Sequence, residues 1–313
     1  MSKSFAFRLM TYFLLISLLP ILVLSFYFYT SVSRTLNANL ADQANQSLDR
    51  VIASLSDCLD DYRHRSYAIS VSDTIRRELS QQGSVPSQEI YQQLYQSMRG
   101  TIYDASAHII SSDGRNKYST HEFPDHYDLR YNSNDVSIAS MLASFTTPTL
   151  LLAERYSNKR QDLVVLNLIR AITDSDGTLL GYVIIDLFST TISNLCNESV
   201  FSDIILIDRL TLKAYSLLHT DTFGDYNRFP ALTEPSTTSG FDTVRLTSNQ
   251  IIAQKPIRST QFSIAGIIET PPYTMLLNRI SWVSLIVLAL SVAAALLFAY
   301  FASKHISKPV STL

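Results

Sequence analysis

Charge is absent from two long stretches of this sequence, residues 9–30 and 280–302. Neither stretch contains Asp, Glu, Lys, Arg or His. At about 1.5 Å of rise per residue, each is long enough as a helix to cross a hydrocarbon core of roughly 30 Å. The absence of charge therefore predicts two membrane spans, with a polar, folded domain between them.

A cleaved signal peptide is the alternative interpretation of the first stretch, because Lys3 and Arg8 precede it. The stretch is longer than the apolar region of an ordinary signal peptide, and no small-residue cleavage site follows its aromatic end. A retained anchor is therefore favoured. These two cationic residues, with two lysines after the second span, favour a cell-membrane protein with both termini in the cytoplasm and the central domain outside.

An excess of positive charge is also missing. The chain has 25 Lys and Arg against 27 Asp and Glu, and setting aside the four cationic residues near its ends leaves 21 against 27, a net charge of −6. This balance argues against a nucleic-acid partner. Cysteine is scarce too: Cys58 and Cys196 both fall in the central domain. A disulfide would persist outside the cell, and two small buried thiols are the alternative.

Motifs that carry catalysis are missing. The sequence has no G-x-x-x-x-G-K-[ST] loop and no G-x-S-x-G turn. His121 and His126 are five residues apart with a proline between them, so they would not share a helix face as the zinc motif H-E-x-x-H requires. His305 follows the second span too closely to be a phospho-acceptor. No catalytic domain, metal site or cofactor is predicted in these 313 residues.

A helical register follows the first span. Apolar residues recur every three or four positions between residues 36 and 62, and neither Gly nor Pro occurs between residues 31 and 82. The pattern predicts one long helix that continues outward from the membrane. Its apolar stripe packs on its own domain in one interpretation, and on the matching helix of a second copy in the other.

Strand signals dominate the rest of the domain. The runs Leu163–Thr173 and Leu179–Phe188 are nearly apolar throughout and are joined by a Gly-containing turn, which predicts a central antiparallel hairpin. A shorter hairpin is predicted around Asp113 and Gly114. A second, smaller unit begins near Val200, with strands expected at 204–208, 213–217, 243–246, 251–256 and 262–269. The fold class is therefore α+β with antiparallel sheets.

Three segments in this order resemble a known family. The sequences FRLMTYFLLISLLPILVLSFYFYTSVSRTL, LVVLNLIRAITDSDGTLLGYVIIDLF and SDIILIDRLTLKAYS resemble the extracellular double Cache (dCache) region of bacterial YesM-type sensor histidine kinases. The tail ISKPVSTL resembles the opening of a HAMP linker, in which a proline follows the membrane helix. The resemblance covers nearly the whole chain. It rests on the order of motifs that are individually unspecific: apolar strands, a Gly-containing turn and one proline.

The resemblance implies two PAS-like α/β modules stacked on a long helix. The expected divisions are a cytoplasmic N-terminus (1–8), a first span (9–30), a long extracellular helix (31–82), a membrane-distal Cache module (83–199), a membrane-proximal Cache module (200–279), a second span (280–302) and the start of a HAMP-like linker (303–313).

The resemblance also implies ligand-binding residues in the distal module. In amino-acid-binding members, an Asp before the connecting helix holds the ligand's amino group, and Asp186 in GYVIIDLF matches that position. A buried ammonium needs such an anionic acceptor; bracing the next turn is the alternative role. Those members hold the carboxylate with an Arg followed by Trp and Tyr. This chain has Arg130 and Tyr131, but its one tryptophan, Trp282, lies in the second span, which puts amino-acid binding in doubt. Further candidate contacts, for which a surface position is the alternative, are Tyr118, His121, Arg155 and Tyr156.

By this resemblance the chain is the sensory input region of a transmembrane receptor. A small extracellular solute would shift the second span, and the segment at Pro309 would relay the shift to a cytoplasmic output. That output is expected to be a histidine kinase with its response regulator, in a homodimer embedded in the lipid bilayer. The alternatives are the input region of a methyl-accepting chemoreceptor or nucleotide cyclase, an orphan membrane-anchored binding protein without output, and a membrane-tethered hydrolase.

Overall fold

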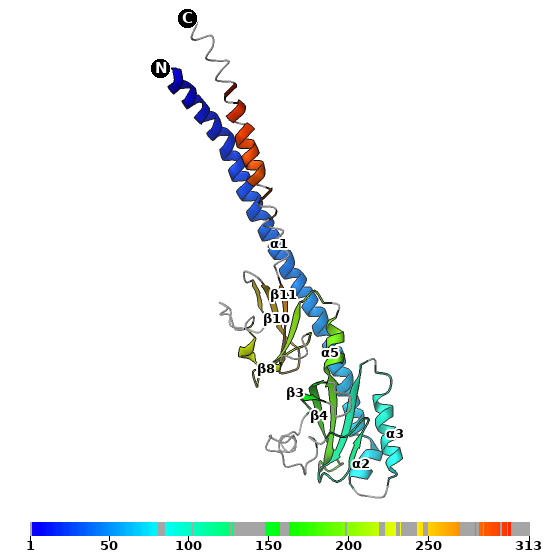
Figure 1. The fold of residues 1–313 in the computed structure, drawn as a ribbon. Helices are drawn as coiled ribbons and strands as arrows, with labels where there is room; N and C mark the ends of the chain where they lie inside the picture. The colour runs from blue at the N-terminus through cyan, green and yellow to red at the C-terminus, as the bar shows by residue number, and fades with distance from the viewer. Residues whose placement is uncertain are drawn as a thin grey trace. The chain divides into compact units, whose positions relative to one another are not determined.

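The structure is a computed structural model (Figure 1). It describes residues 2–80, 85–101, 103–124, 127, 148–156, 163–197, 199–218, 223–229, 232, 243–246, 250–269, 279, 282–283, 285–294, 296–298 and 300–301. The chain divides into two compact units. One contains Met1–Gln43, Thr247–Ile251 and Glu269–Leu313, and the other contains Ala44–Leu246 and Ile252–Ile268.

A single long helix, α1, spans Ser2–Ser70, which confirms the long N-terminal helix. Among the described residues, no helix has a segment that combines the length and the apolar character needed to span a bilayer.

The predicted helix over 31–82 is wrong in its continuity, because α1 ends at Ser70 and a separate helix α2 spans Asp73–Leu79. No Gly or Pro makes this break. The hydroxyl of Ser70 donates to the carbonyl of Tyr67 at 2.8 Å, and Arg76 Nε donates to the carbonyl of Ser70 at 3.0 Å. The Ser70 hydroxyl and the Arg76 guanidinium thus donate to backbone carbonyls that would accept amide N–H groups if the helix continued.

Five strands form the first antiparallel sheet, sheet A, in the order β2-β1-β5-β4-β3. Their bounds are β1 Ala105–Ser111, β2 Lys117–Ser119, β3 Thr149–Tyr156, β4 Leu163–Thr173 and β5 Leu179–Phe188. Both predicted hairpins are confirmed, β1–β2 and β4–β5, and the nearly apolar β4 and β5 lie inside the sheet rather than at its edges.

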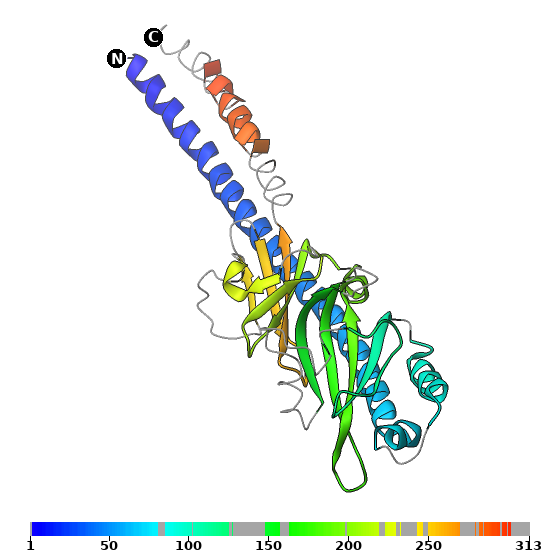
Figure 2. The same ribbon diagram turned by 60° about the horizontal axis from the view of Figure 1, so that its bottom comes forward.

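Helices cover one face of sheet A, the face of α1, α2 and α3 (Ser87–Met98), as the blue and cyan ribbons of Figure 2 show. Arg170 of β4 donates from Nε to the hydroxyl of Ser66 on α1 at 3.1 Å. The hydroxyl of Tyr62 on α1 donates to the carbonyl of Tyr103 at 2.9 Å. These contacts fix which sheet residues face the helices and which face the other side.

The second sheet, sheet B, has six strands in the order β8-β7-β6-β11-β10-β9 and follows the short helix α5, Ser189–Cys196. Its bounds are β6 Asp203–Asp208, β7 Lys213–Ser216, β8 Phe223–Asp225, β9 Thr243–Leu246, β10 Gln250–Pro256 and β11 Phe262–Glu269. The five predicted strands are confirmed, and β8 with the 3-10 turn η2, Tyr226–Arg228, is additional.

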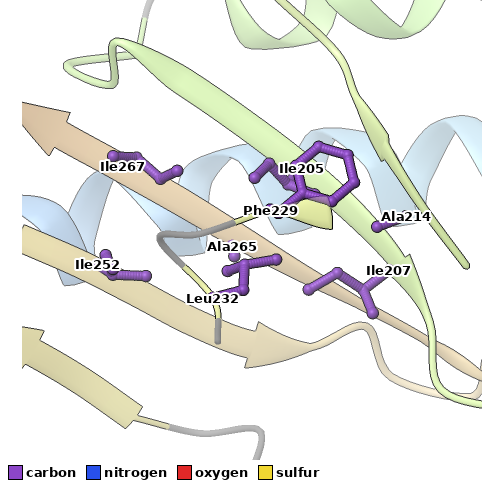
Figure 3. Packing of buried hydrophobic residues seen from close by; sticks show 8 residues of the cluster. All are labelled: Ile205, Ile207, Ala214, Phe229, Leu232, Ile252, Ala265 and Ile267. Carbon is purple, nitrogen blue, oxygen red and sulfur yellow. The ribbon is translucent and has the colours of Figure 1, made fainter. Parts of the chain in front are cut away.

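A hydrophobic cluster covers one face of sheet B. Figure 3 shows its side chains converging from the strands and from the segment around Phe229: Ile205, Ile207, Ala214, Phe229, Leu232, Ile252, Ala265 and Ile267. All eight are buried. This face of sheet B is therefore filled by apolar side chains. In sheet A, by contrast, the inner strands carry buried polar side chains.

Candidate functional site

The face of sheet A opposite the helices changes from polar at one end to apolar at the other. Strand pairing aligns Ser106 of β1, Asp186 of β5 and Asn167 of β4 in one row. The next two rows are apolar except for one histidine: His108–Ile184–Ile169 and Ile110–Tyr182–Ala171. Register alone therefore gathers polar side chains that are distant in sequence at one end of the sheet.

Asp186 is the centre of this polar end and is almost fully buried, with 1% of its surface exposed. The hydroxyl of Tyr127 donates to Asp186 Oδ1 at 2.5 Å, and Asn167 Nδ2 donates to the same oxygen at 2.7 Å. Asn167 Nδ2 also lies 2.9 Å from the hydroxyl of Tyr127. A buried carboxylate requires such donors, because desolvation without them is costly.

His108 supplies the donor for the other carboxylate oxygen. Its Nε2 lies 3.0 Å from Asp186 Oδ2 and 3.0 Å from the hydroxyl of Ser106, and its Nδ1 lies 2.8 Å from the hydroxyl of Ser119. The partners are satisfied when the imidazole carries a proton on Nε2 and accepts the Ser119 hydroxyl on Nδ1. We call these six residues the Asp186 cluster: Ser106, His108, Ser119, Tyr127, Asn167 and Asp186.

Aromatic rings pack against the Asp186 cluster. The ring of His108 lies 5.5 Å from that of Tyr127 and 6.0 Å from that of Phe123, both edge to face. The amide of Tyr127 donates to the carbonyl of Pro124 at 3.0 Å, which helps to hold Tyr127 beside the sheet. The cluster is thus a polar network enclosed by rings, in which hydrogen bonds are stronger than in water.

The chain Ser119–His108–Asp186 has the connectivity of a hydrolase triad, which bears on the hydrolase alternative. A nucleophilic serine must reach its substrate, but Ser119 is 6% exposed and its oxygen accepts the amide of His121 at 3.1 Å. His108 is 1% exposed. In the state described, the arrangement holds Asp186 in place, and the Ser119 hydroxyl is buried and engaged rather than exposed to a substrate.

Tyr118 and His121 lie outside the cluster, although both were candidate ligand contacts. The side chain of Tyr118 points to the helical face, where its hydroxyl donates to Glu78 Oε1 of α2 at 2.5 Å. Burial, the hydrogen bond to Glu78 and the charge of Glu78 together raise the pKa of Tyr118. His121 is exposed, with its ring 6.5 Å from that of Phe188.

The other candidates are only partly within the described structure. Arg155 and Tyr156 lie in β3, paired with Val164 and Leu163, but their side chains are outside the described part. Arg130, Tyr131 and Pro309 lie outside the described residues.

Asp186 was the one member of the cluster that the sequence identified, and its other five members were missed. His108 and Asn167 are single polar residues in apolar runs, ASAHIIS and LVVLNLI, and only the pairing with β5 brings them to Asp186. Tyr127 is one of seventeen tyrosines. A polar residue inside an apolar strand was the one available signal, because it needs a partner on the same face.

Cys58 and Cys196 are both buried free thiols, so the disulfide is wrong and the alternative of two buried thiols is confirmed. Burial raises the pKa of each thiol from 9.0 to about 12, and the nearby carboxylate of Asp61 adds to this at Cys58. Among the described residues, no group of three His, Cys, Asp or Glu side chains is placed to hold a metal ion.

Comparison with known proteins identifies the fold. No family model and no curated protein matches the chain. The ligand-binding domain of the Pseudomonas aeruginosa amino acid chemoreceptor PctB, in complex with L-Arg, matches with a TM-score of 0.54 and 16% identity over 75% of this chain and 97% of that one. The ligand-binding domain of the Pseudomonas fluorescens chemoreceptor CtaA, in complex with L-isoleucine, matches with a TM-score of 0.53 and 16% identity. That match covers 79% of this chain and 98% of the CtaA domain.

A third solved structure comes from another class of receptor. The extracellular domain of the putative histidine kinase vpHK1S-Z8 matches with a TM-score of 0.53 and 12% identity, over 74% of this chain and 92% of that one. At such identities the likeness shows the fold alone. It confirms the expected α+β architecture of a long N-terminal helix with two antiparallel sheets.

Proposed function

We propose that this chain is the sensory input region of a transmembrane receptor and binds a small extracellular solute at the Asp186 cluster. The observation that carries the proposal is this buried polar network, which lies on the face of sheet A opposite α1, α2 and α3. Support also comes from the fold, because the similar domains of PctB and CtaA were solved with amino acids bound.

The solute exchanges with the Tyr127 hydroxyl at Asp186. Three donors from the described residues already engage the Asp186 carboxylate, so an ammonium or hydroxyl group of a solute must displace one of its donors. Tyr127 is the one that does not belong to a strand of the sheet. A hydrogen bond to a charged group contributes about 1.5–3 kcal/mol. The hydrogen bond that the solute makes to Asp186 is therefore similar in free energy to the Tyr127 bond that it replaces. A modest difference in affinity then shifts the equilibrium between the solute-free and the solute-bound state.

The Asp186 cluster is next to the connection between the two sheets. Asp186 lies three residues before Ser189, where α5 begins, and α5 leads into β6 of sheet B. The hydroxyl of Thr191 on α5 donates to the carbonyl of Asp104, just before β1, at 2.6 Å. A shift of β5 on solute binding is therefore transmitted to α5 through covalent continuity and this contact.

Residues 9–30 and 280–302 cross the bilayer in this proposal, with both termini in the cytoplasm. Large apolar side chains in both stretches are exposed, a feature expected of surfaces that meet lipid or another chain. Examples are Ile16, Leu19, Phe26, Leu285, Leu290 and Phe298. The chain acts as a homodimer of the YesM type, and the HAMP-like segment at Pro309 relays the signal to a histidine kinase and its response regulator.

The input region of a chemoreceptor, the input region of a cyclase and an orphan binding protein would each bind the solute through the same cluster. They differ in the domain encoded after residue 313, so the reading frame of the gene beyond Leu313 distinguishes them. A kinase domain there would support the proposed output, and a chemoreceptor or cyclase domain would replace it.

The binding proposal is tested by thermal-shift screening of the full chain in nanodiscs against amino acids, sugars and carboxylates. We expect one class of solute to raise the melting temperature, and Asp186→Asn to abolish the rise. Asp113→Asn, in the exposed turn between β1 and β2, is the matched control and keeps the response. An Asp186→Asn chain that folds and responds as the unmodified chain does would contradict the proposal.

A further inference from the structure

A cleft lies along α1, away from the Asp186 cluster. It has a volume of about 290 Å³ and lies between α1 and the segment around the end of α5. Its lining residues are Ser47, Arg50, Val51, Ala53, Ser54, Leu195 and Ser199. None of them belongs to the Asp186 cluster, so the cleft would bind a ligand independently of that site.

Arg50 is the only charged residue that the described part of the chain contributes to this lining. Its guanidinium is exposed, and its one contact among the described residues is a long hydrogen bond from Nε to the carbonyl of Gln46 at 3.4 Å. The neighbouring carboxylate of Asp49 is engaged by Lys255 Nζ at 2.7 Å. By contrast, Arg63 pairs with Asp60, one helical turn before it on α1. Arg50 therefore lines the cleft with most of its five N–H donors unengaged by the described residues.

Serine hydroxyls surround the same space. Within the described part of the chain, no hydrogen bond engages the hydroxyls of Ser54 and Ser199. Ser47 accepts the amide of Val200 at 3.4 Å, which leaves its own O–H free to donate. Among the described residues, the lining thus presents a guanidinium and hydroxyl donors and no carboxylate, a combination that favours an anionic ligand.

The remainder of the lining is apolar. Val51 of α1 and Leu195 of α5 contribute aliphatic surface beside the guanidinium. The volume is at the lower end of that of pockets for small organic molecules. A ligand that matches both parts has an anionic oxygen group at one end and a short hydrocarbon body at the other.

We propose that this cleft binds a small organic carboxylate. Arg50 holds the carboxylate through two parallel N–H···O bonds, the serine hydroxyls add hydrogen bonds, and Val51 and Leu195 contact the hydrocarbon body. Because Ser47 already contacts Val200 of the connector to sheet B, a ligand here links α1 to that connector. This assigns the chain a second input, beyond the solute site at Asp186.

The test uses the full chain in nanodiscs with sodium butyrate, 1-butanol or inorganic phosphate, at constant ionic strength. Butyrate at ten times its dissociation constant is expected to raise the melting temperature by about 3 °C, whereas 1-butanol gives no rise. Arg50→Gln is expected to abolish the rise. Arg77→Gln is the matched control, because Arg77 is also exposed and makes the same 3.4 Å contact from Nε to a carbonyl four residues earlier.

Several outcomes would overturn the assignment. The proposal fails if butyrate gives no rise, or if Arg50→Gln responds as the unmodified chain does. A rise with phosphate as large as that with butyrate would also contradict it, since the apolar side of the cleft would then contribute nothing. The response must persist in Asp186→Asn, which separates this site from the solute site at the Asp186 cluster.

Discussion

The hydroxyl of Tyr127 provides the sharpest test of the Asp186 cluster. Tyr127→Phe keeps the buried ring and removes the oxygen that donates to Asp186 Oδ1 at 2.5 Å and accepts Asn167 Nδ2 at 2.9 Å. Asn167 retains its 2.7 Å bond to Asp186, so no buried amide is orphaned. The cost is therefore that of one hydrogen bond to a charged group, about 1.5–3 kcal/mol of unfolding free energy.

This cost is measurable as a change in melting temperature. For a folded unit of this size, 1 kcal/mol corresponds to about 2–4 °C, so Tyr127→Phe should lower the melting temperature by about 3–12 °C. Urea denaturation of the same variant gives the free energy directly. A double-mutant cycle with Asp186→Asn should show a coupling of about 1–3 kcal/mol between the two positions.

Tyr67→Phe is the control for this prediction. Tyr67 is 57% exposed, and its ring packs beside the guanidinium of Arg170, a contact that Phe preserves. This substitution should change the unfolding free energy by less than about 0.5 kcal/mol. A loss in Tyr127→Phe no larger than in Tyr67→Phe would refute the hydrogen-bonded cluster as a source of stability.

The remaining predictions concern glycines and thiols. Gly181→Ala should cost about 1–3 kcal/mol or more in urea denaturation, because a Cβ there would overlap the backbone oxygen of Ile110 and β1 must move away from β5. Gly177→Ala meets no atom within 4 Å and should cost only about 1 kcal/mol, from its φ of +83°; a larger loss at Gly177 than at Gly181 would contradict this reasoning. Because burial raises the pKa of Cys58 and Cys196 from 9.0 to about 12, their contribution to stability is complete below pH 9 and is lost as the pH rises toward 12. Melting temperatures measured from pH 8 to pH 11 should therefore fall less in a Cys58→Ala, Cys196→Ala chain than in the unmodified one, and an equal fall would contradict the buried thiols.

Strands with long apolar runs were predictable from the sequence because their signal is local. The hairpin Leu163–Thr173 and Leu179–Phe188 has the predicted bounds, since two apolar runs and a Gly-containing turn define it. The end of α1 at Ser70 was not predictable in the same way, because side chains of Ser70 and Arg76 make the break without Gly or Pro.

The candidate site was only partly predictable, because it depends on strand register. The position of Asp186 follows from its place in β5, but its partners come from β1, from β4 and from Tyr127, which belongs to no strand. β2 is three residues long, too short to show which of Tyr118 and Ser119 faces the helices. The structure places Tyr118 against Glu78 and Ser119 against His108.

Hydrogen–deuterium exchange of the full chain, with and without the solute found by screening, tests the location of binding most directly. We expect slower amide exchange in peptides that contain the Asp186 cluster, at residues 105–111, 119–127, 163–171 and 179–188. Exchange in the strands of sheet B, residues 203–216 and 250–269, should change less. Protection confined to sheet B, with exchange at the Asp186 cluster unchanged, would contradict solute binding at Asp186.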